Sequence, residues 1–138
     1  MTAAPAHRST LRRRQRLLKT SSFQAVYAAH ARAADGRLVA YAMPNGLAQT
    51  RVGLSVGKRC GPSVARNRIK RFLRESFRQA RHGFPAGYDI VLVPIARDYT
   101  FAEVDRAVRA LVPEAIRRSR RAARPRPADA AGEGTVGG

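Results

Sequence analysis

The first apolar residues along the chain recur at a helical period. Phe23, Val26 and Tyr27 fall at i, i+3 and i+4, so they share one face of a helix. Ser21 or Ser22 lies just before them and offers a side-chain oxygen that can cap the helix. The pattern therefore predicts a short helix with an aromatic face.

Two segments with the character of strands follow. Leu38–Met43 is an apolar run of strand length that ends at the turn signal Pro44–Gly46. Val52–Val56 then alternates apolar residues with glycine and serine, which is the period of a half-buried strand. We predict two strands joined as a hairpin. Residues 30–34, which precede them, suit either a short extra strand or the end of a helix.

The longest predicted helix lies in the middle of the chain. Gly61 and Pro62 break the preceding segment, Ser63 offers a cap, and apolar residues then keep helical spacing up to Gly83. Tyr88–Pro94 is a nearly continuous apolar run, as expected of a central strand that is covered on both faces.

A third helix should close the domain. Thr100 and Glu103 form a capping box, and the apolar residues after them make one stripe up to Leu111. Pro113 should kink or restart this helix, because proline lacks the N–H that the helix needs. The alternation of strands and helices predicts a sheet with helices packed against it.

Composition separates a folded centre from the two ends of the chain. Residues 1–10 are small and polar, and residues 122–138 are mostly Ala, Pro, Arg and Gly. Neither segment offers enough apolar surface to offset the entropy of ordering, so we expect both to be disordered. Residues 11–121 should form one domain, because a chain of 138 residues is long enough for a single core.

The charge of the chain points to a polyanionic partner. Lys and Arg number 27 against 9 Asp and Glu, a formal net charge of +18, which would repel itself in a compact fold unless a polyanion neutralised it. An anionic membrane is the alternative, but no apolar stretch approaches the roughly 20 residues of a spanning helix. We therefore expect nucleic acid and no membrane. No apolar segment with a cleavage site follows the basic N-terminal residues, so we expect the protein in the cytoplasm.

Basic residues concentrate on and just before the long predicted helix. Those between positions 51 and 81 are Arg51, Lys58, Arg59, Arg66, Arg68, Lys70, Arg71, Arg74, Arg78 and Arg81. On a helical wheel centred on Ile69, the basic residues that follow it lie opposite the apolar face, while Arg66 and Arg68 lie on its two flanks. A solvated face is the alternative, but such faces interleave acids with bases, and this one has only Glu75. We interpret the face as a phosphate-contacting surface, and its many arginines favour RNA.

The titratable residues give no sign of a protein active site. Cys60 is the single cysteine, so we interpret it as a spectator thiol, and the three histidines lack the spacing of metal ligands. Paired carboxylates and a nucleophile beside a base are also missing from the sequence pattern. We therefore assign no catalytic residue and no metal site to the chain.

The segment Arg51–Arg78 closely resembles the signature of the bacterial ribonuclease P protein component. A strand of the form R-x-G-L-S-V, a loop that contains lysine, and the helix motif R-N-R-x-K-R-x-x-R-E stand at fixed spacing, which makes the match specific. The resemblance extends from about Leu11 to Arg118.

This resemblance implies a fold and a function. The family fold is an α/β (α+β) two-layer sandwich with about four strands and three helices in the order αβββαβα, and its β-α-β crossover is left-handed, against the usual rule. Family members are subunits of an endoribonuclease that removes the 5′ leader from precursor tRNA, and the catalytic groups belong to the RNA. The expected partners are the ribonuclease P catalytic RNA and precursor tRNA. No cofactor is expected on the protein, and Mg²⁺ is expected to act through the RNA.

The resemblance also assigns two sets of site residues. The residues that match ribozyme-binding positions are Lys58, Arg59, Arg66, Asn67, Arg68, Lys70, Arg71 and Arg74. Those that match the cleft for the single-stranded leader are Phe23, Tyr27, Val39, Tyr41 and Ser55. From the residues alone, the aromatic members could equally be core, since aromatic residues at helical spacing are usually buried.

Two other classes of protein share some of these features. A structural RNA-binding protein, such as a ribosomal protein, fits the charge equally well. A helix-turn-helix DNA regulator would need a short helix just before the basic one, where Val52–Val56 reads as a strand instead. The sequence does not indicate whether the free protein dimerises.

Overall fold

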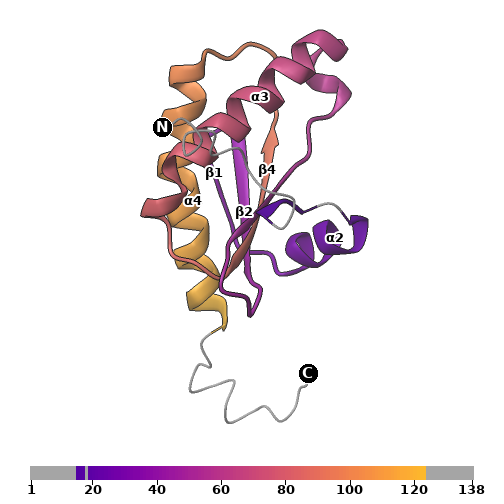
Figure 1. The fold of residues 1–138 in the computed structure, drawn as a ribbon. Coiled ribbons are helices and arrows are strands. Elements are labelled where there is room, and N and C mark those ends of the chain that lie inside the picture. The colour runs from indigo at the N-terminus through magenta and orange to yellow at the C-terminus, as the bar shows by residue number, and fades with distance from the viewer. Residues whose placement is uncertain (1–14, 18, 124–138) are drawn as a thin grey trace, which may run out of the picture.

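The computed structural model describes residues 15–17 and 19–123, which form a four-stranded sheet with three α-helices (Figure 1). The elements are α2 (Thr20–Ala28), β1 (Arg32–Ala34), β2 (Leu38–Pro44), β3 (Arg51–Leu54), α3 (Ser63–Ala80), β4 (Tyr88–Pro94) and α4 (Phe101–Ala123), with 3-10 turns at Lys58–Cys60 and Arg81–Gly83. This order confirms the expected αβββαβα arrangement. The predicted segment 1–10 and residues 124–138 of the predicted tail 122–138 lie outside the described residues. Residues 122 and 123 belong to α4, so the helix continues two residues into the predicted tail.

The strands lie in the order β1-β2-β4-β3. β2 is antiparallel to both β1 and β4, whereas β3 is parallel to β4. The predicted hairpin between β2 and β3 is therefore wrong, because β4 lies between them. The connection at residues 45–50 crosses two strand spacings, roughly 10 Å, which is too far for a tight turn.

The segment that suited either a strand or a helix end is the short edge strand β1. It pairs with β2, and Arg32 lies opposite Tyr41. His30 takes a left-handed conformation, with φ 60°, and its N–H donates to the carbonyl of Tyr27 at 3.1 Å. This residue follows the C-cap of α2 and turns the chain into β1, which is why helix and strand signals overlap in this stretch.

The main core lies between the sheet and a layer made by α3 and α4. Alternate residues of the sheet point to this layer, including Leu38 and Ala40 of β2 and Ile90 and Leu92 of β4. From the helices, the buried residues are Ile69, Leu73 and Phe77 of α3 and Val104, Val108, Leu111, Val112, Ala115 and Ile116 of α4. The sheet and this helical layer are the expected sandwich. α3 connects the parallel strands β3 and β4, and the left hand of this crossover stays a prediction.

The opposite face of the sheet is covered only in part. α2 packs there through Val26, which is fully buried with Leu17 and Val91 in a second, smaller cluster. In Figure 1, α2 lies across the sheet from α4. The rest of this face leaves side chains of β2 and β4 half-buried.

The helix ends follow the sequence signals only in part. Thr100 and Glu103 form the predicted capping box: the Glu103 N–H donates to Thr100 Oγ1 at 3.1 Å and the Thr100 N–H to Glu103 Oε1 at 2.9 Å. The caps predicted at Ser21 or Ser22 and at Ser63 are wrong. Both helices begin earlier than those signals place them, with Lys19 and Pro62 at their N-cap positions and no side-chain cap.

α4 runs through Pro113 as one continuous helix, so the predicted restart is wrong. Proline in a helix costs about 3 kcal/mol relative to alanine. Val112, Ala115 and Ile116, which flank it, are fully or almost fully buried against the sheet. Their packing holds the helix together on both sides of the proline.

Arg51 and Asp89 form an ion pair between neighbouring residues of β3 and β4. The Arg51 guanidinium donates to both carboxylate oxygens, at 2.8 and 2.7 Å, and Asn45 Nδ2 donates to Asp89 Oδ1 at 2.8 Å. Asp89 is only 2% exposed. The hydrogen bond raises the pKa of Arg51, so this arginine stays charged within the pair. Arg51 is thus a structural residue, although the sequence pattern counts it with the basic residues that precede the long helix.

Replacing Asp89 should destabilise the fold strongly. We expect Asp89→Ala to lower the free energy of unfolding by about 3 kcal/mol, because it leaves Arg51 and Asn45 without their acceptor. Urea denaturation followed by circular dichroism measures this loss. Asp98→Ala, at an exposed carboxylate, is the control and should change the value by less than about 0.5 kcal/mol. Equal losses in both variants would contradict the structural role.

Candidate nucleic-acid interface

The basic and apolar residues of α3 lie on opposite sides of the helix, as the wheel predicts. Ile69, Leu73 and Phe77 are buried against the sheet and α4. Arg68 and Arg71 are exposed on the other side, together with Asn67 and Arg74. Lys70 is half-buried beside them. The residues assigned to ribozyme binding therefore do form one surface along α3.

The N-terminal end of α3 adds further positive charge to this surface. Lys58 and Arg59 lie exposed in the 3-10 turn just before the helix. Arg66 folds back over the first turn, where its Nε donates to the carbonyl of Gly61 at 3.1 Å and its Nη2 to Ser63 Oγ at 3.3 Å. These bonds fix the guanidinium beside the helix N-terminus, where backbone N–H groups favour an anion.

Two other basic residues of α3 and its end contact side chains of the protein. Arg78 pairs with Glu75, and this hydrogen bond holds the pKa of Glu75 below its usual range. Arg81 Nη1 donates to Gln15 Oε1 at 3.0 Å. We therefore restrict the name basic surface to the eight residues Lys58, Arg59, Arg66, Asn67, Arg68, Lys70, Arg71 and Arg74.

The residues assigned to the leader cleft lie together on the face of the sheet that α2 partly covers. We call them the aromatic surface: Phe23, Tyr27, Val39, Tyr41 and Ser55. The rings of Tyr27 and Tyr41 meet edge to face, with centroids 4.9 Å apart. Both are half-buried, whereas Val26 and Val91 beneath them are fully buried. The alternative that these aromatic residues belong to the core is therefore only partly correct, because Tyr27 and Tyr41 are half-buried and not fully enclosed.

Strand register places the aromatic surface in two rows across the sheet. Gly53, Val91 and Tyr41 are neighbours in one row, and the Phe23 ring lies over Gly53, where an added Cβ would come within 2.5 Å of it. Val39 pairs with Val93 in the next row. Ser55 continues this row past β3, and its N–H donates to the carbonyl of Leu92 at 3.0 Å.

A groove of about 230 Å³ joins the aromatic surface to the basic surface. Phe23 and Gly53 line one part of it, and Lys70 and Arg74 of α3 line another. Its remaining lining residues are Arg16, Leu17, Val52 and Leu54. Phe23 of the aromatic surface and Lys70 and Arg74 of the basic surface therefore line the same groove. Sequence reasoning missed Arg16 at this groove, because the position depends on a single parallel bridge to Val52 that leaves no periodic pattern.

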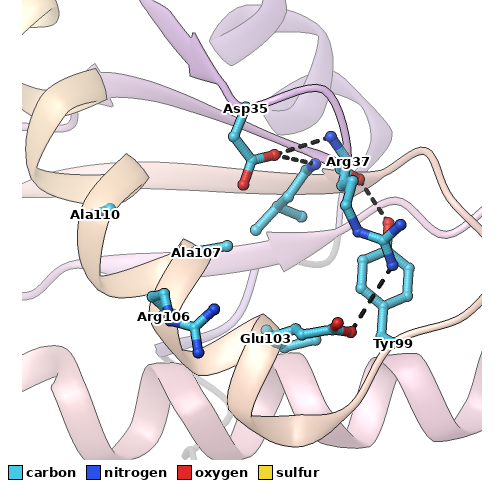
Figure 2. A pocket seen from close by; sticks show the side chains of 9 residues that line it. Asp35, Arg37, Tyr99, Glu103, Arg106, Ala107 and Ala110 are labelled. Atoms are coloured by element: carbon cyan, nitrogen blue, oxygen red, sulfur yellow. Dashed lines mark hydrogen bonds and ion pairs between the residues drawn. The ribbon is translucent and has the colours of Figure 1, made fainter.

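A second pocket, of about 300 Å³, lies between the turn that joins β1 to β2 and the start of α4 (Figure 2). Asp35 Oδ1 accepts the N–H groups of Arg37 and Leu38 at 2.9 and 2.8 Å, and the Arg37 guanidinium lies 4.9 Å from the centre of the Tyr99 ring. Acidic and basic side chains alternate around it, with Glu103 beside Arg37. This balance of charge is not that of a phosphate site, and the contacts serve to fix the turn between β1 and β2 against the start of α4.

Cys60 is fully buried, and its thiol lies 3.4 Å from the carbonyl oxygen of Pro94. Burial raises the pKa of this thiol and so disfavours the reactive thiolate. Within residues 15–17 and 19–123, no three His, Cys, Asp or Glu side chains are grouped so that they could hold a metal ion. None of the helices in this part of the chain is long and apolar enough to cross a membrane.

Comparison with known proteins gives consistent matches to one family. The family model described as Ribonuclease P matches residues 11–116, more than half of the chain. The ribonuclease P protein component of Caldanaerobacter subterraneus is 47% identical over 78 residues, which is 56% of this chain and 67% of that protein. The corresponding protein of Alkaliphilus oremlandii is 37% identical over 95 residues, which is 67% of this chain and 83% of that protein.

Solved structures agree with the sequence matches. The RNase P protein of Staphylococcus aureus aligns with a TM-score of 0.62 at 30% identity, covering 68% of this chain and 88% of that one. The RNase P protein of Thermotoga maritima aligns with a TM-score of 0.59 at 27% identity, covering 66% and 88% of the two chains.

The closeness of Phe23 to Gly53 makes a testable prediction about the aromatic surface. We expect Gly53→Ala to lower the free energy of unfolding by about 1–3 kcal/mol, because the new methyl group must displace the Phe23 ring. Thermal or urea denaturation measures this change. Gly57→Ala is the matched control, since an added Cβ there meets nothing within 4 Å. An unchanged stability of Gly53→Ala would show that Phe23 does not pack on β3 as described.

Proposed function

Because the chain belongs to the ribonuclease P protein family, and is therefore the protein subunit of the ribonucleoprotein that matures tRNA 5′ ends, we propose how it divides its two surfaces between RNAs. The basic surface binds the catalytic RNA, and the aromatic surface binds the single-stranded 5′ leader of precursor tRNA. We also propose that the protein acts in the cytoplasm.

The basic surface suits a folded RNA because its charge is not neutralised within the protein. Arg68, Arg71 and Arg74 are exposed, and no carboxylate of the described residues forms an ion pair with them. Guanidinium groups hold phosphate oxygens in bidentate fashion, so a row of them on one rigid helix fits an RNA backbone. Binding here would release counterions and depend steeply on salt.

The aromatic surface suits a single strand of any sequence. Bases stack on aromatic rings without base-specific hydrogen bonds, and each stacked base contributes about 1–3 kcal/mol. The half-buried rings of Tyr27 and Tyr41 are held edge to face by the sheet and α2, so they keep one orientation before a ligand binds. A leader that varies from one tRNA precursor to the next needs such a tolerant surface.

The single observation that carries this proposal is the groove between the two surfaces. Lys70 and Arg74 from α3 and Phe23 from α2 line the same groove. A leader that lies on the aromatic surface would therefore run directly to the surface that holds the catalytic RNA. In this arrangement the protein contributes binding and position, and the RNA contributes the reacting groups and the Mg²⁺ ions.

Loss of exposed charge on α3 should weaken binding to the catalytic RNA. We expect Arg68→Ala with Arg71→Ala to raise the Kd for a bacterial ribonuclease P RNA by about five- to tenfold. The slope of log Kd against log salt should fall by roughly 1.5, because two phosphate contacts are lost. Filter binding over a salt series measures both values. Arg106→Ala with Arg109→Ala removes the same charge from exposed positions of α4 and should leave both near wild type. Equal losses in the two double variants would contradict a specific surface.

Loss of one ring should affect the leader and not the tRNA body. With the holoenzyme reconstituted on a bacterial ribonuclease P RNA, we expect Tyr41→Ala to reduce the preference for precursor over mature tRNA by about fivefold or more. Tyr41→Phe keeps the ring and should keep the preference. The ratio of the two Kd values, measured at low magnesium, reports the effect. If Tyr41→Ala weakens both substrates equally, the leader does not bind at this surface.

A further inference from the structure

Arg32 places an unpaired positive charge at the edge of the aromatic surface. It lies on the edge strand β1 directly opposite Tyr41, so the two side chains share one face of the sheet. The Arg32 guanidinium is 6.0 Å from the centre of the Tyr41 ring, and the residue is exposed. Among the described residues, no carboxylate lies within ion-pair distance of it.

Arg118 of α4 brings a second guanidinium to the same edge. Its Nη1 donates to the backbone carbonyl of Arg32 at 2.8 Å, and its Nε donates to Glu114 Oε2 at 2.8 Å. Ala31 uses its own carbonyl to accept from Ala42 of β2, so the next carbonyl, that of Arg32, points away from the sheet. Arg118 thereby satisfies an outward-facing group of the edge strand.

These two bonds hold Arg118 in place without hiding it. Two of the five N–H donors of the guanidinium are used within the protein, and the side chain is still 49% exposed. A cation fixed in this way loses little further side-chain entropy when it binds an anion. The geometry is that of a prepared phosphate contact.

The charge around Arg118 is not balanced. Glu114 is shared between Arg117 and Arg118, which leaves one carboxylate for two guanidinium groups. Arg121 lies exposed one turn further along the helix. Together with Arg32, the end of α4 and the start of β1 carry an excess of positive charge at the β1 edge of the sheet.

We propose that Arg32 and Arg118 extend the leader-binding surface across β1 by holding backbone phosphates of leader nucleotides that lie beyond Tyr41. This inference rests on the proposed binding of the leader at the aromatic surface. Stacked bases on the rings and phosphates on the adjacent arginines are the two kinds of contact by which proteins follow a single strand. The site adds affinity for the distal part of the leader without reading its sequence.

The position of the site makes its contribution depend on leader length. The groove at Lys70 and Arg74 lies at the β3 side of the sheet, and Arg32 lies at the β1 side. Three strand spacings separate these two edges, a distance of about 14 Å. A short leader therefore reaches the rings of the aromatic surface and ends before Arg32, whereas a longer one passes over both arginines.

A series of precursor tRNAs whose leaders lengthen one nucleotide at a time tests the site. Kd values are measured with holoenzyme reconstituted on a bacterial ribonuclease P RNA. For wild type, affinity should rise again once the leader is long enough to cross β1. In Arg32→Gln with Arg118→Gln this second rise of about three- to fivefold should disappear, while Kd values for mature tRNA and short leaders stay unchanged. The salt slope for long leaders should fall by about 0.7 per lost phosphate contact.

Control variants separate a phosphate contact from a structural effect. The Arg32 side chain makes no hydrogen bond to the described residues, so Arg32→Gln alone leaves the Arg118 bond to the strand intact. This variant should still reduce the gain in affinity that a longer leader gives. Arg106→Gln with Arg109→Gln removes two exposed charges elsewhere on α4 and should keep the wild-type length dependence.

The outcomes distinguish this inference from the proposal on which it rests. Two results together would overturn the β1 site alone. In the first, Arg32→Gln with Arg118→Gln keeps the wild-type dependence of Kd on leader length. In the second, Tyr41→Ala loses the preference for precursors with short leaders over mature tRNA. Equal weakening of mature tRNA in the arginine variants would also overturn it, because the effect would then be general. An unchanged leader preference in Tyr41→Ala would overturn leader binding at the aromatic surface, and the extension with it.

Discussion

The ion pair between Arg51 and the buried Asp89 joins register partners of β3 and β4, and the positions of the basic surface and the aromatic surface depend on that register. A slip of one residue would turn Val52 and Leu54 outward and bring Gly53 and Ser55 into the core. Gly53 would then no longer lie beneath the Phe23 ring, where its missing side chain leaves room for the ring. Since β3 leads into α3, the same slip would rotate the start of the helix that carries the basic surface. This pair, with its buried carboxylate, thus couples the position of the aromatic rings to that of the arginines.

The two long helices use arginine in opposite ways. On α4, Arg109, Arg117 and Arg118 form ion pairs with acidic residues three or four positions away. Much of their charge is therefore neutralised within the helix. On α3, Glu75 is the acid, and it pairs with Arg78 near the C-terminal end. The first turns of α3 therefore keep their charge for a ligand. The end of α4 departs from its own pattern, because one glutamate there serves two arginines.

Local patterns predicted local structure well, and they failed where distant segments meet. The separation of basic and apolar faces on α3 follows from the helical period alone, so it could be read from Arg66 to Arg78. The hairpin was wrong because β4, far along the sequence, inserts between β2 and β3. The role of Arg51 was missed for the same reason, since its partner is Asp89. The residues of the aromatic surface were predicted from the family resemblance. Arg32 was missed because the sequence of a short edge strand does not indicate that a residue of α4, Arg118, contacts it.

The covering of both sheet edges has a consequence for the free subunit. An exposed edge strand offers unpaired N–H and C=O groups to which another chain can add a strand. Here Leu17 donates its N–H to the carbonyl of Val52 at 2.9 Å on the β3 side, and Arg118 covers the carbonyl of Arg32 on the β1 side. One outward-facing backbone group on each edge is thus already bonded within the protein, which disfavours self-association by sheet extension, and at β1 the group that forms this bond is the side chain of Arg118.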